Sequence, residues 1–165
     1  KGTGDAVLKA KRYIKDKYFL MLFTDDLIIN SNCSKEMVKT HNKYNGSVIA
    51  SMKVKKKTVD RWGIFSVEKK LDKLNFKISD VVEKPNIKDA PSNNAIVGRY
   101  ILPKKIFYYL KNQKKGKGGE VHITDSIKRM ILEKNLFVGH NFKGKYLDCG
   151  SMNGYINSGV KIAKL

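Results

Sequence analysis

An unbroken run of six apolar residues, Tyr18 to Phe23 (YFLMLF), constrains the fold of this chain more than any other feature. Lys17 precedes it and Asp25 follows closely. A short apolar run without polar alternation is typical of a strand that is covered on both faces, as in parallel sheets. We therefore predict a buried central strand here, in an α/β domain whose helices cover the sheet.

The remaining segments alternate between helical and strand-like periods, which also favours one α/β domain over residues 1–165. The periods predict helices at 5–15, 34–45, 104–110, 120–135 and 150–165, with Ser34 as an N-cap and Pro103 at a first helical position. They predict strands at 46–54, 62–70, 74–84, 95–102 and 136–142, of which 62–70 and 74–84 form a hairpin. Residues 55–57 and 113–119 read as basic loops. Since the chain opens on a glycine turn and a helix, we expect the first strands of the sheet to be missing.

The net charge is +19, from 34 Lys and Arg against 15 Asp and Glu. A charge of this size is typical of nucleic-acid binders. However, only Arg12, Arg61, Arg99 and Arg129 are arginine, the residue that base and phosphate recognition favours. The lysines are also scattered along the chain. We therefore interpret most of the charge as exposed lysine surface and do not expect a nucleic-acid partner.

The two cysteines, Cys33 and Cys149, form neither a disulfide framework nor a zinc-binding spacing. This favours reduced thiols in a cytoplasmic protein. No apolar run approaches the roughly 18 residues that a membrane helix needs, and the first residues do not resemble a signal peptide. We expect no membrane partner.

Acidic residues follow the apolar run directly, as Thr24-Asp25-Asp26. Carboxylates at the end of a buried strand stand in the ligand crevice of an open α/β sheet, and one or two of them suit Mg²⁺ beside substrate phosphates. The alternative is that an Asp caps the next turn. The spacing alone favours neither reading.

The strand at 74–84 ends on Glu83 and Lys84, just before Pro85. Adjacent residues of an extended strand point to opposite sides, so this pair suits two parts of a ligand better than a mutual ion pair. Glu83 would accept hydrogen bonds from sugar hydroxyls, and Lys84 would neutralise a phosphate. By itself, a Glu-Lys pair is more often an ordinary feature of a surface strand.

Asp148 precedes Cys149 and Gly150, just before the last predicted helix. It is either a second metal carboxylate or the cap of that helix. The three histidines are scattered, no Cys/His pair is suggested, and no nucleophile elbow occurs, so hydrolytic triads are not expected.

Seven strings in a fixed order give the chain a clear resemblance. They are KGTGDAV at 1–7, LFTDDLII at 22–29, WGI at 62–64, VVEKP at 81–85, APSNNAIVGRY at 90–100, GGEVHITDSI at 118–127 and GKYLDCGSMNGY at 144–155. Together they resemble the bacterial UTP–glucose-1-phosphate uridylyltransferases (UDP-glucose pyrophosphorylases), members of the nucleotide-sugar transferase superfamily. The resemblance covers essentially the whole chain and implies a Rossmann-like mixed sheet.

The resemblance also implies roles for the matching residues. Gly2 would lie against uracil, and Asp25 with Asp148 would bind Mg²⁺. Glucose 1-phosphate would be bound by Gly63, Glu83 and Lys84, and the wall of the sugar pocket would include Val97, Gly98 and Arg99. Asp25 and Lys84 would be the catalytic residues.

The implied reaction is attack by the phosphate of glucose 1-phosphate on the α-phosphorus of UTP, giving UDP-glucose and pyrophosphate. Positioning and charge neutralisation, without a protein nucleophile, suffice for such a transfer. The alternatives are another sugar-nucleotide transferase, such as a thymidylyltransferase, and a noncatalytic basic remnant that binds polyanions or a partner subunit.

The chain departs from the family's pattern at three places. Asp5 and His122 stand where the family usually has His and Gln, and the glycine-rich Gly-x-Gly-Thr-Arg loop that holds the triphosphate does not occur. We therefore expect weak or no activity from this chain alone. We also expect either a homo-oligomer or a complementing N-terminal portion.

Overall fold

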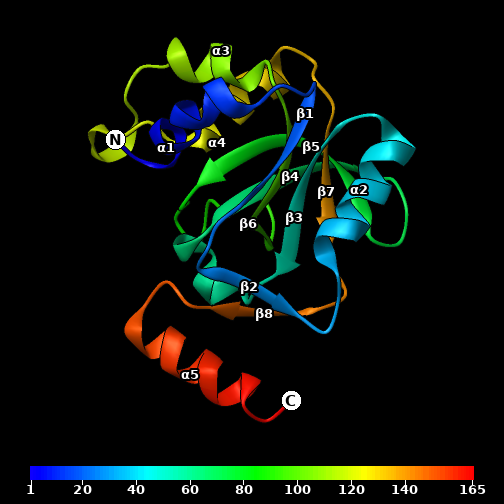
Figure 1. Ribbon diagram of the computed structural model, residues 1–165, viewed down its shortest axis with the longest axis vertical. Coiled ribbons are helices and arrows are strands. Elements are labelled where there is room, and N and C mark those ends of the chain that lie inside the picture. The colour runs from blue at the N-terminus through cyan, green and yellow to red at the C-terminus, as the bar shows by residue number, and fades with distance from the viewer.

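The computed structural model describes residues 1–165, apart from the side chain of Lys117. Its helices are α1 (Thr3–Lys9), α2 (Cys33–Tyr44), α3 (Ile106–Lys111), α4 (Ile123–Leu132) and α5 (Met152–Ile162). Its strands are β1 (Tyr18–Leu22), β2 (Asp26–Ile29), β3 (Ser47–Lys53), β4 (Gly63–Lys70), β5 (Asn75–Glu83), β6 (Asn94–Pro103), β7 (Phe137–Asn141) and β8 (Lys145–Asp148). Short 3₁₀ turns lie at Ala10–Tyr13, Lys56–Arg61 and Lys117–Gly119. Figure 1 shows their arrangement.

Six strands form one mixed sheet in the order β1-β6-β3-β7-β5-β4, which confirms the predicted α/β fold with a mixed sheet. Only β3 and β7 are parallel to each other among the pairs of this sheet in the described structure; the others are antiparallel. The predicted hairpin is also confirmed, as β4 and β5. A further contact between Ile64 of β4 and Ala95 of β6 curls the sheet around at that end.

The prediction of a buried central strand at residues 18–23 is wrong. Within the described residues β1 hydrogen-bonds only to β6, so it is an edge strand, and it is antiparallel to its partner. Leu20 and Leu22 keep 38% and 44% of their surface exposed. An apolar run indicates that a strand can be buried on both faces. It does not show whether this chain supplies the elements that would bury it.

Helices cover both faces of the sheet. On one face α1, α3 and α4 pack on sheet residues through a large apolar cluster that includes Phe65, Phe107 and Phe137. On the other face α2 inserts Met37 against a smaller cluster that includes Val97. A third, smaller cluster of Val59, Ile64 and Ala95 completes the core.

The lower end of the molecule in Figure 1 carries a part that the sequence did not predict, a two-stranded ribbon of β2 and β8. Asp26 pairs with Asp148 in this ribbon. The last helix, α5, follows from β8. The ribbon therefore brings two acidic segments together that are far apart in the sequence.

Two local predictions also need correction. The N-cap of α2 is Asn32 and not Ser34, since the Asn32 side chain accepts a hydrogen bond from the amide of Lys35 at 3.0 Å. Pro103 ends β6 and does not begin α3, which starts at Ile106. Among the residues that the structure describes, no helix is long and apolar enough to cross a membrane.

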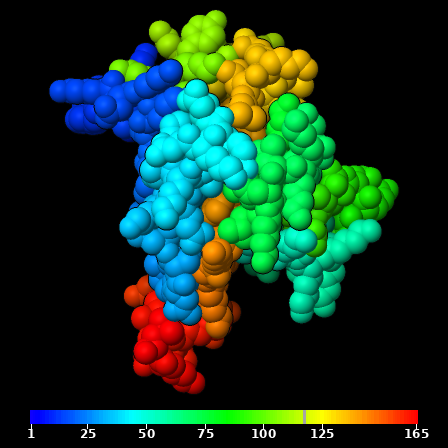
Figure 2. Space-filling model, turned by 90° about the vertical axis from the view of Figure 1, so that its right-hand side faces the viewer, coloured from blue at the N-terminus to red at the C-terminus, as the bar shows by residue number. Residues whose placement is uncertain are grey.

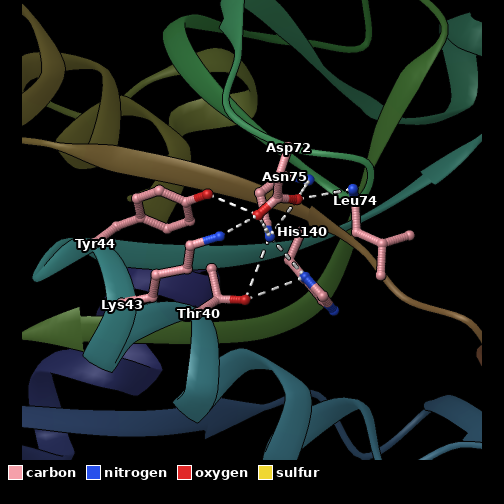
Figure 3. Close-up of polar contacts among 7 residues, drawn as sticks. All are labelled: Thr40, Lys43, Tyr44, Asp72, Leu74, Asn75 and His140. Carbon is pink, nitrogen blue, oxygen red and sulfur yellow. Dashed lines mark hydrogen bonds and ion pairs between the residues drawn. The ribbon is translucent and has the colours of Figure 1, made fainter.

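A network of polar side chains joins α2 to the turn of the β4–β5 hairpin (Figure 3). Asp72 in that turn accepts hydrogen bonds from the backbone amide of Leu74 at 2.9 Å, from Lys43 Nζ at 2.9 Å and from Tyr44 Oη at 2.6 Å. Asn75 donates to both Asp72 oxygens and accepts at Oδ1 from His140 Nδ1 at 2.8 Å. The network fixes the hairpin turn against α2 and β7.

Candidate functional site

A cavity of about 320 Å³ opens beside the end of β5 and the middle of β6, and its size is at the lower end of the range of small-molecule sites. We call it the β5–β6 cavity. Its lining combines acidic, basic and aromatic side chains with two glycines. The residues are Thr3, Phe23, Asp26, Arg61, Trp62, Gly63, Glu83, Lys84, Ile96, Gly98, Tyr100, Glu120, His122, Ile123 and Thr124.

Strand β6 forms one wall of this cavity through alternate residues. Ile96, Gly98 and Tyr100 line it, because side chains along a strand point to opposite faces in turn. Val97 lies on the opposite face, buried in the cluster around α2. The structure therefore does not bring Val97 or its neighbour Arg99 to the cavity wall.

Gly98 is required at its position by close packing. Its amide donates to Asp26 Oδ2 at 2.6 Å, and its carbonyl accepts from the amide of Phe23 at 2.7 Å. A Cβ at this position would overlap both the Asp26 carboxylate and the Phe23 ring. The absence of a side chain thus lets the segment that carries the acidic residues lie directly on β6.

Glu83 and Lys84 both line the cavity, although an extended backbone would send them to opposite sides. Strand β5 ends at Glu83, and Lys84 has a left-handed φ of 45°, so the chain turns between them. The Lys84 amide donates to the Trp62 carbonyl at 3.0 Å. Gly63 lies next to Glu83: a Cβ on Gly63 would be 3.2 Å from Glu83 Oε2. The structure thus brings Gly63, Glu83 and Lys84 together.

Asp25 and Asp148 also lie together, around Gly150. A Cβ on Gly150 would be 2.8 Å from Asp25 Oδ2 and 3.3 Å from Asp148 Oδ1. The amide of Cys149 donates to the Asp25 carbonyl at 2.8 Å, and the amide of Gly150 donates to Asp148 Oδ1 at 2.9 Å. Ser151, and not Asp148, is the N-cap of α5. Asp148 is therefore not the cap of that helix, which leaves its carboxylate beside Asp25.

Asp26 links this acidic pair to the cavity, a role that the sequence did not reveal. Besides Gly98, it accepts a hydrogen bond from Tyr146 Oη at 2.5 Å. Burial raises the pKa of Asp26 above its ordinary value, the bonds from Tyr146 and Gly98 oppose this shift, and the charges of Asp25 and Asp148 add to it. Burial, followed by the bond to Asp26, raises the pKa of Tyr146, so that Tyr146 remains a neutral donor.

Gly2 does not line the cavity but borders it. Its φ is 93°, and a Cβ there would lie 2.9 Å from the Val121 carbonyl oxygen and 2.9 Å from the Cβ of Glu120. The amide of Gly4 donates to the same Val121 carbonyl at 2.8 Å. The glycine turn thus lies against the segment that brings Glu120 to the cavity.

The donor set suits Mg²⁺ better than a transition metal. Among the described residues no group of three or more His, Cys, Asp and Glu gathers in a metal-binding arrangement. The two neighbouring carboxylates of Asp25 and Asp148 fit a cation that keeps several waters and takes its other ligands from substrate phosphates.

Sequence comparison gives a consistent result over the whole chain. The nucleotidyl transferase family model matches residues 1–164. The UTP–glucose-1-phosphate uridylyltransferase of Pseudomonas aeruginosa is 37% identical over 161 residues, which are 96% of this chain and 57% of that protein. The enzyme of the same name from Streptococcus pyogenes is 35% identical over 99% of this chain and 55% of its own length. The chain thus spans just over half the length of these relatives.

Solved structures agree with the sequence comparison. A UDP-glucose pyrophosphorylase complexed with UDP-glucose superposes with a TM-score of 0.93 at 36% identity, covering 99% of this chain and 62% of that one. A UTP-bound enzyme of this type from Acinetobacter baumannii gives 0.84 at 30% identity, over 96% and 55%. A glucose-1-phosphate thymidylyltransferase structure from Bacillus anthracis, at 20% identity and a TM-score of 0.76, shares the fold.

Proposed function

The chain belongs to the nucleotidyl transferase family, and from this premise we propose that it forms the sugar-binding part of an enzyme that makes UDP-glucose and pyrophosphate from UTP and glucose 1-phosphate. The names of its relatives support this choice of substrates over a thymidylyl transfer. The observation that carries the proposal is that Glu83 and Lys84, adjacent in sequence, both line one cavity beside Gly63.

The chemistry of the cavity suits a sugar phosphate. Glu83 offers acceptor oxygens for sugar hydroxyls, and Lys84 offers a cation for the phosphate. In the described residues no carboxylate pairs with the Lys84 ammonium group, so its charge is available to a ligand. Tyr100 lines the cavity as a neutral phenol, because burial, with smaller contributions from Glu83 and Asp26, raises its pKa.

The proposed reaction is an in-line displacement. A phosphate oxygen of glucose 1-phosphate forms a bond to the α-phosphorus of UTP, and the bond from that phosphorus to the bridging oxygen breaks, so that pyrophosphate leaves. Catalysis then consists of holding the two phosphates together and neutralising their charge. Lys84 serves this role on the sugar side.

Asp25 and Asp148 would hold Mg²⁺ in the same proposal. When bound, the ion would neutralise charge on the nucleotide phosphates. Asp26 would not be a ligand, since its oxygens accept from Gly98 and Tyr146. We also propose a cytoplasmic setting, which is supported by the two free thiols of Cys33 and Cys149.

Calorimetric titration of the 165-residue chain with UDP-glucose and MgCl₂ tests the proposal. We expect binding, and we expect Glu83→Ala to weaken it about 10- to 100-fold, because removing a charged hydrogen-bond acceptor costs roughly 1.5–3 kcal/mol. Glu68→Ala is the matched control: Glu68 lies on the partner strand of the same hairpin, pairs with Lys77 and does not line the cavity.

Three outcomes would contradict the proposal. They are no binding by the wild-type chain, equal binding by Glu83→Ala and wild type, and equal weakening by the two variants. Circular dichroism of each variant checks that the β4–β5 hairpin still folds.

A further inference from the structure

A second hollow, of about 530 Å³, lies at the carboxyl ends of the parallel strands β3 and β7. We call it the lysine pocket. Its lining residues are Ser51, Met52, Lys53, Lys73, Asn141, Phe142, Gly144, Lys145 and Tyr146. In Figure 2 the orange β7–β8 segment, which supplies several of them, is visible between the cyan of α2 and the green of the β4–β5 hairpin.

Three lysines from three separate segments line this pocket. Lys53 ends β3, Lys73 lies in the turn between β4 and β5, and Lys145 begins β8. Within the part of the chain that the structure describes, none of the three makes an ion pair or hydrogen bond through its ammonium group. Like charges that gather in a concave surface without counter-charges create a positive potential there.

The neighbouring carboxylate cannot neutralise these lysines. Asp72 is next to Lys73 in the chain, but its oxygens already accept from Lys43, Tyr44 and Asn75 (Figure 3). Among the described lining residues none is acidic. The polar network of the hairpin turn thus leaves the charge of Lys73 free for a ligand.

The inner wall of the pocket carries polar groups that lack partners. Ser51 is only 1% exposed, and its hydroxyl makes no hydrogen bond in the described structure; the same holds for Oδ1 of Asn141. The two residues are register partners on β3 and β7. Buried polar groups are nearly always paired, so the Ser51 hydroxyl is available to donate to a ligand, whereas Asn141 Oδ1 can only accept and would not bind an anion.

We propose that the lysine pocket binds a small anion with several negative charges, of the di- or triphosphate type. Its volume fits a small molecule. Since its three cations line one hollow, a compact anion fits better than an extended nucleic-acid backbone. Carboxyl ends of parallel strands are also where open α/β sheets bind ligands.

The lysine pocket is separate from the β5–β6 cavity but shares a wall with it. The Tyr146 ring lines the lysine pocket and contacts the ring of Trp62, which lines the cavity, at 5.7 Å between centroids. The Tyr146 hydroxyl points to Asp26. The two cavities have no lining residue in common, so the proposed anion site does not rest on the proposed transferase reaction.

Titration of the 165-residue chain with sodium tripolyphosphate tests this proposal. The titration is done by calorimetry in EDTA and about 150 mM salt, so that metal-dependent phosphate binding is absent and weak surface attraction is screened. We expect binding to one site, and a loss of at least tenfold in affinity for the double variant Lys73→Gln, Lys145→Gln.

The control is the double variant Lys11→Gln, Lys161→Gln, which removes the same charge from exposed positions outside the pocket. We expect it to bind within twofold of wild type. Equal weakening by both double variants would overturn the proposal in favour of unspecific attraction by the +19 chain. Absence of one-site binding to the wild type would also overturn it, as would equally tight binding of a DNA oligonucleotide that the Lys73 and Lys145 changes leave unaffected.

Discussion

Replacing Tyr146 by Phe removes one hydroxyl from the centre of the acidic segment. That hydroxyl donates to Asp26 Oδ1 at 2.5 Å, and after its removal Asp26 retains the amide of Gly98 as its donor at 2.6 Å. The remainder of the ring keeps its contacts, including that with Trp62. The change therefore isolates a single hydrogen bond to a half-buried carboxylate.

The expected loss of stability at neutral pH is about 1.5–3 kcal/mol, the range for a hydrogen bond to a charged group. In a domain of this length that corresponds to a fall in Tm of roughly 3–12 °C. Both estimates refer to conditions in which Asp26 is ionised, because only the carboxylate accepts the bond at full strength.

The loss of stability caused by Tyr146→Phe should grow as the pH rises. The folded-state pKa of Asp26 lies above its ordinary value of 3.8, so the folded chain keeps a proton that the unfolded chain releases. Stability therefore falls as the pH rises through the folded-state pKa. The hydrogen bond from Tyr146 lowers the pKa of Asp26, and without this bond the fall in stability extends to higher pH. The variant and the wild type should thus differ least near pH 4 and most above pH 7.

Urea unfolding at pH 4 and pH 7.5, followed by circular dichroism, measures this difference. Tyr155→Phe is the control, since Tyr155 is 66% exposed on α5 and should change stability by less than about 0.5 kcal/mol. A Tyr146→Phe loss that is equal at the two pH values, or as small as that of the control, would refute the reasoning.

Three other changes test separate parts of the structure. Burial raises the pKa of Asp72, but its hydrogen bonds outweigh burial and lower the pKa below 3.8, so its contribution is present above pH 4 and shrinks progressively in acid. Asp72→Asn should cost roughly 1.5–3 kcal/mol at pH 7 and less at pH 2, by urea unfolding. The exposed leucines on the free edge of β1 predict self-association, and Leu22→Lys should shift the chain toward monomer in light scattering, whereas a monomeric wild type would count against an open edge. Burial raises the pKa of Cys33 to about 11, and Cys33 is 3% exposed, so a thiol reagent should modify only Cys149 in the folded chain and both cysteines in urea.

The sequence predicted the elements that carry a strong period, and it failed where a partner decides the structure. Strands β4 and β5 are two β-rich runs joined by a short turn, so their hairpin could be predicted. The run from Tyr18 to Phe23 is equally apolar on both faces, but its position at the sheet edge depends on which other strand pairs with it. The four-residue strands β2 and β8 are too short to show a period, and their pairing spans more than a hundred residues.

The candidate site shows the same division. The acidic residues at 25 and 148 and the pair Glu83-Lys84 were identified from motifs, and the structure brings each pair together. Val97 was placed on the pocket wall with Gly98, although a strand cannot direct both to one face. The alternation of side chains along β6 could have predicted that Ile96 and Tyr100, and not Val97, line the cavity with Gly98. Arg61 and Glu120 also line the cavity, but they lie in segments whose sequence patterns give no sign that they meet there, so the sequence could not predict them.

The turn at Lys84 shows how the fold makes a site from two adjacent residues. A left-handed φ in a residue other than glycine costs about 1 to 2 kcal/mol. Asn30 and Asn45, which also have positive φ, carry a short side chain that tolerates it, and Lys134 follows the end of α4, where such a φ is common. Lys84 has neither advantage, yet at the cavity it keeps this backbone conformation, held by its amide bond to Trp62. An extended backbone would relieve the strain but turn either Glu83 or Lys84 away from the cavity. The strained conformation is therefore what allows the end of one strand to present both residues to the same ligand, Glu83 as an acceptor for hydroxyls and Lys84 as a cation for phosphate.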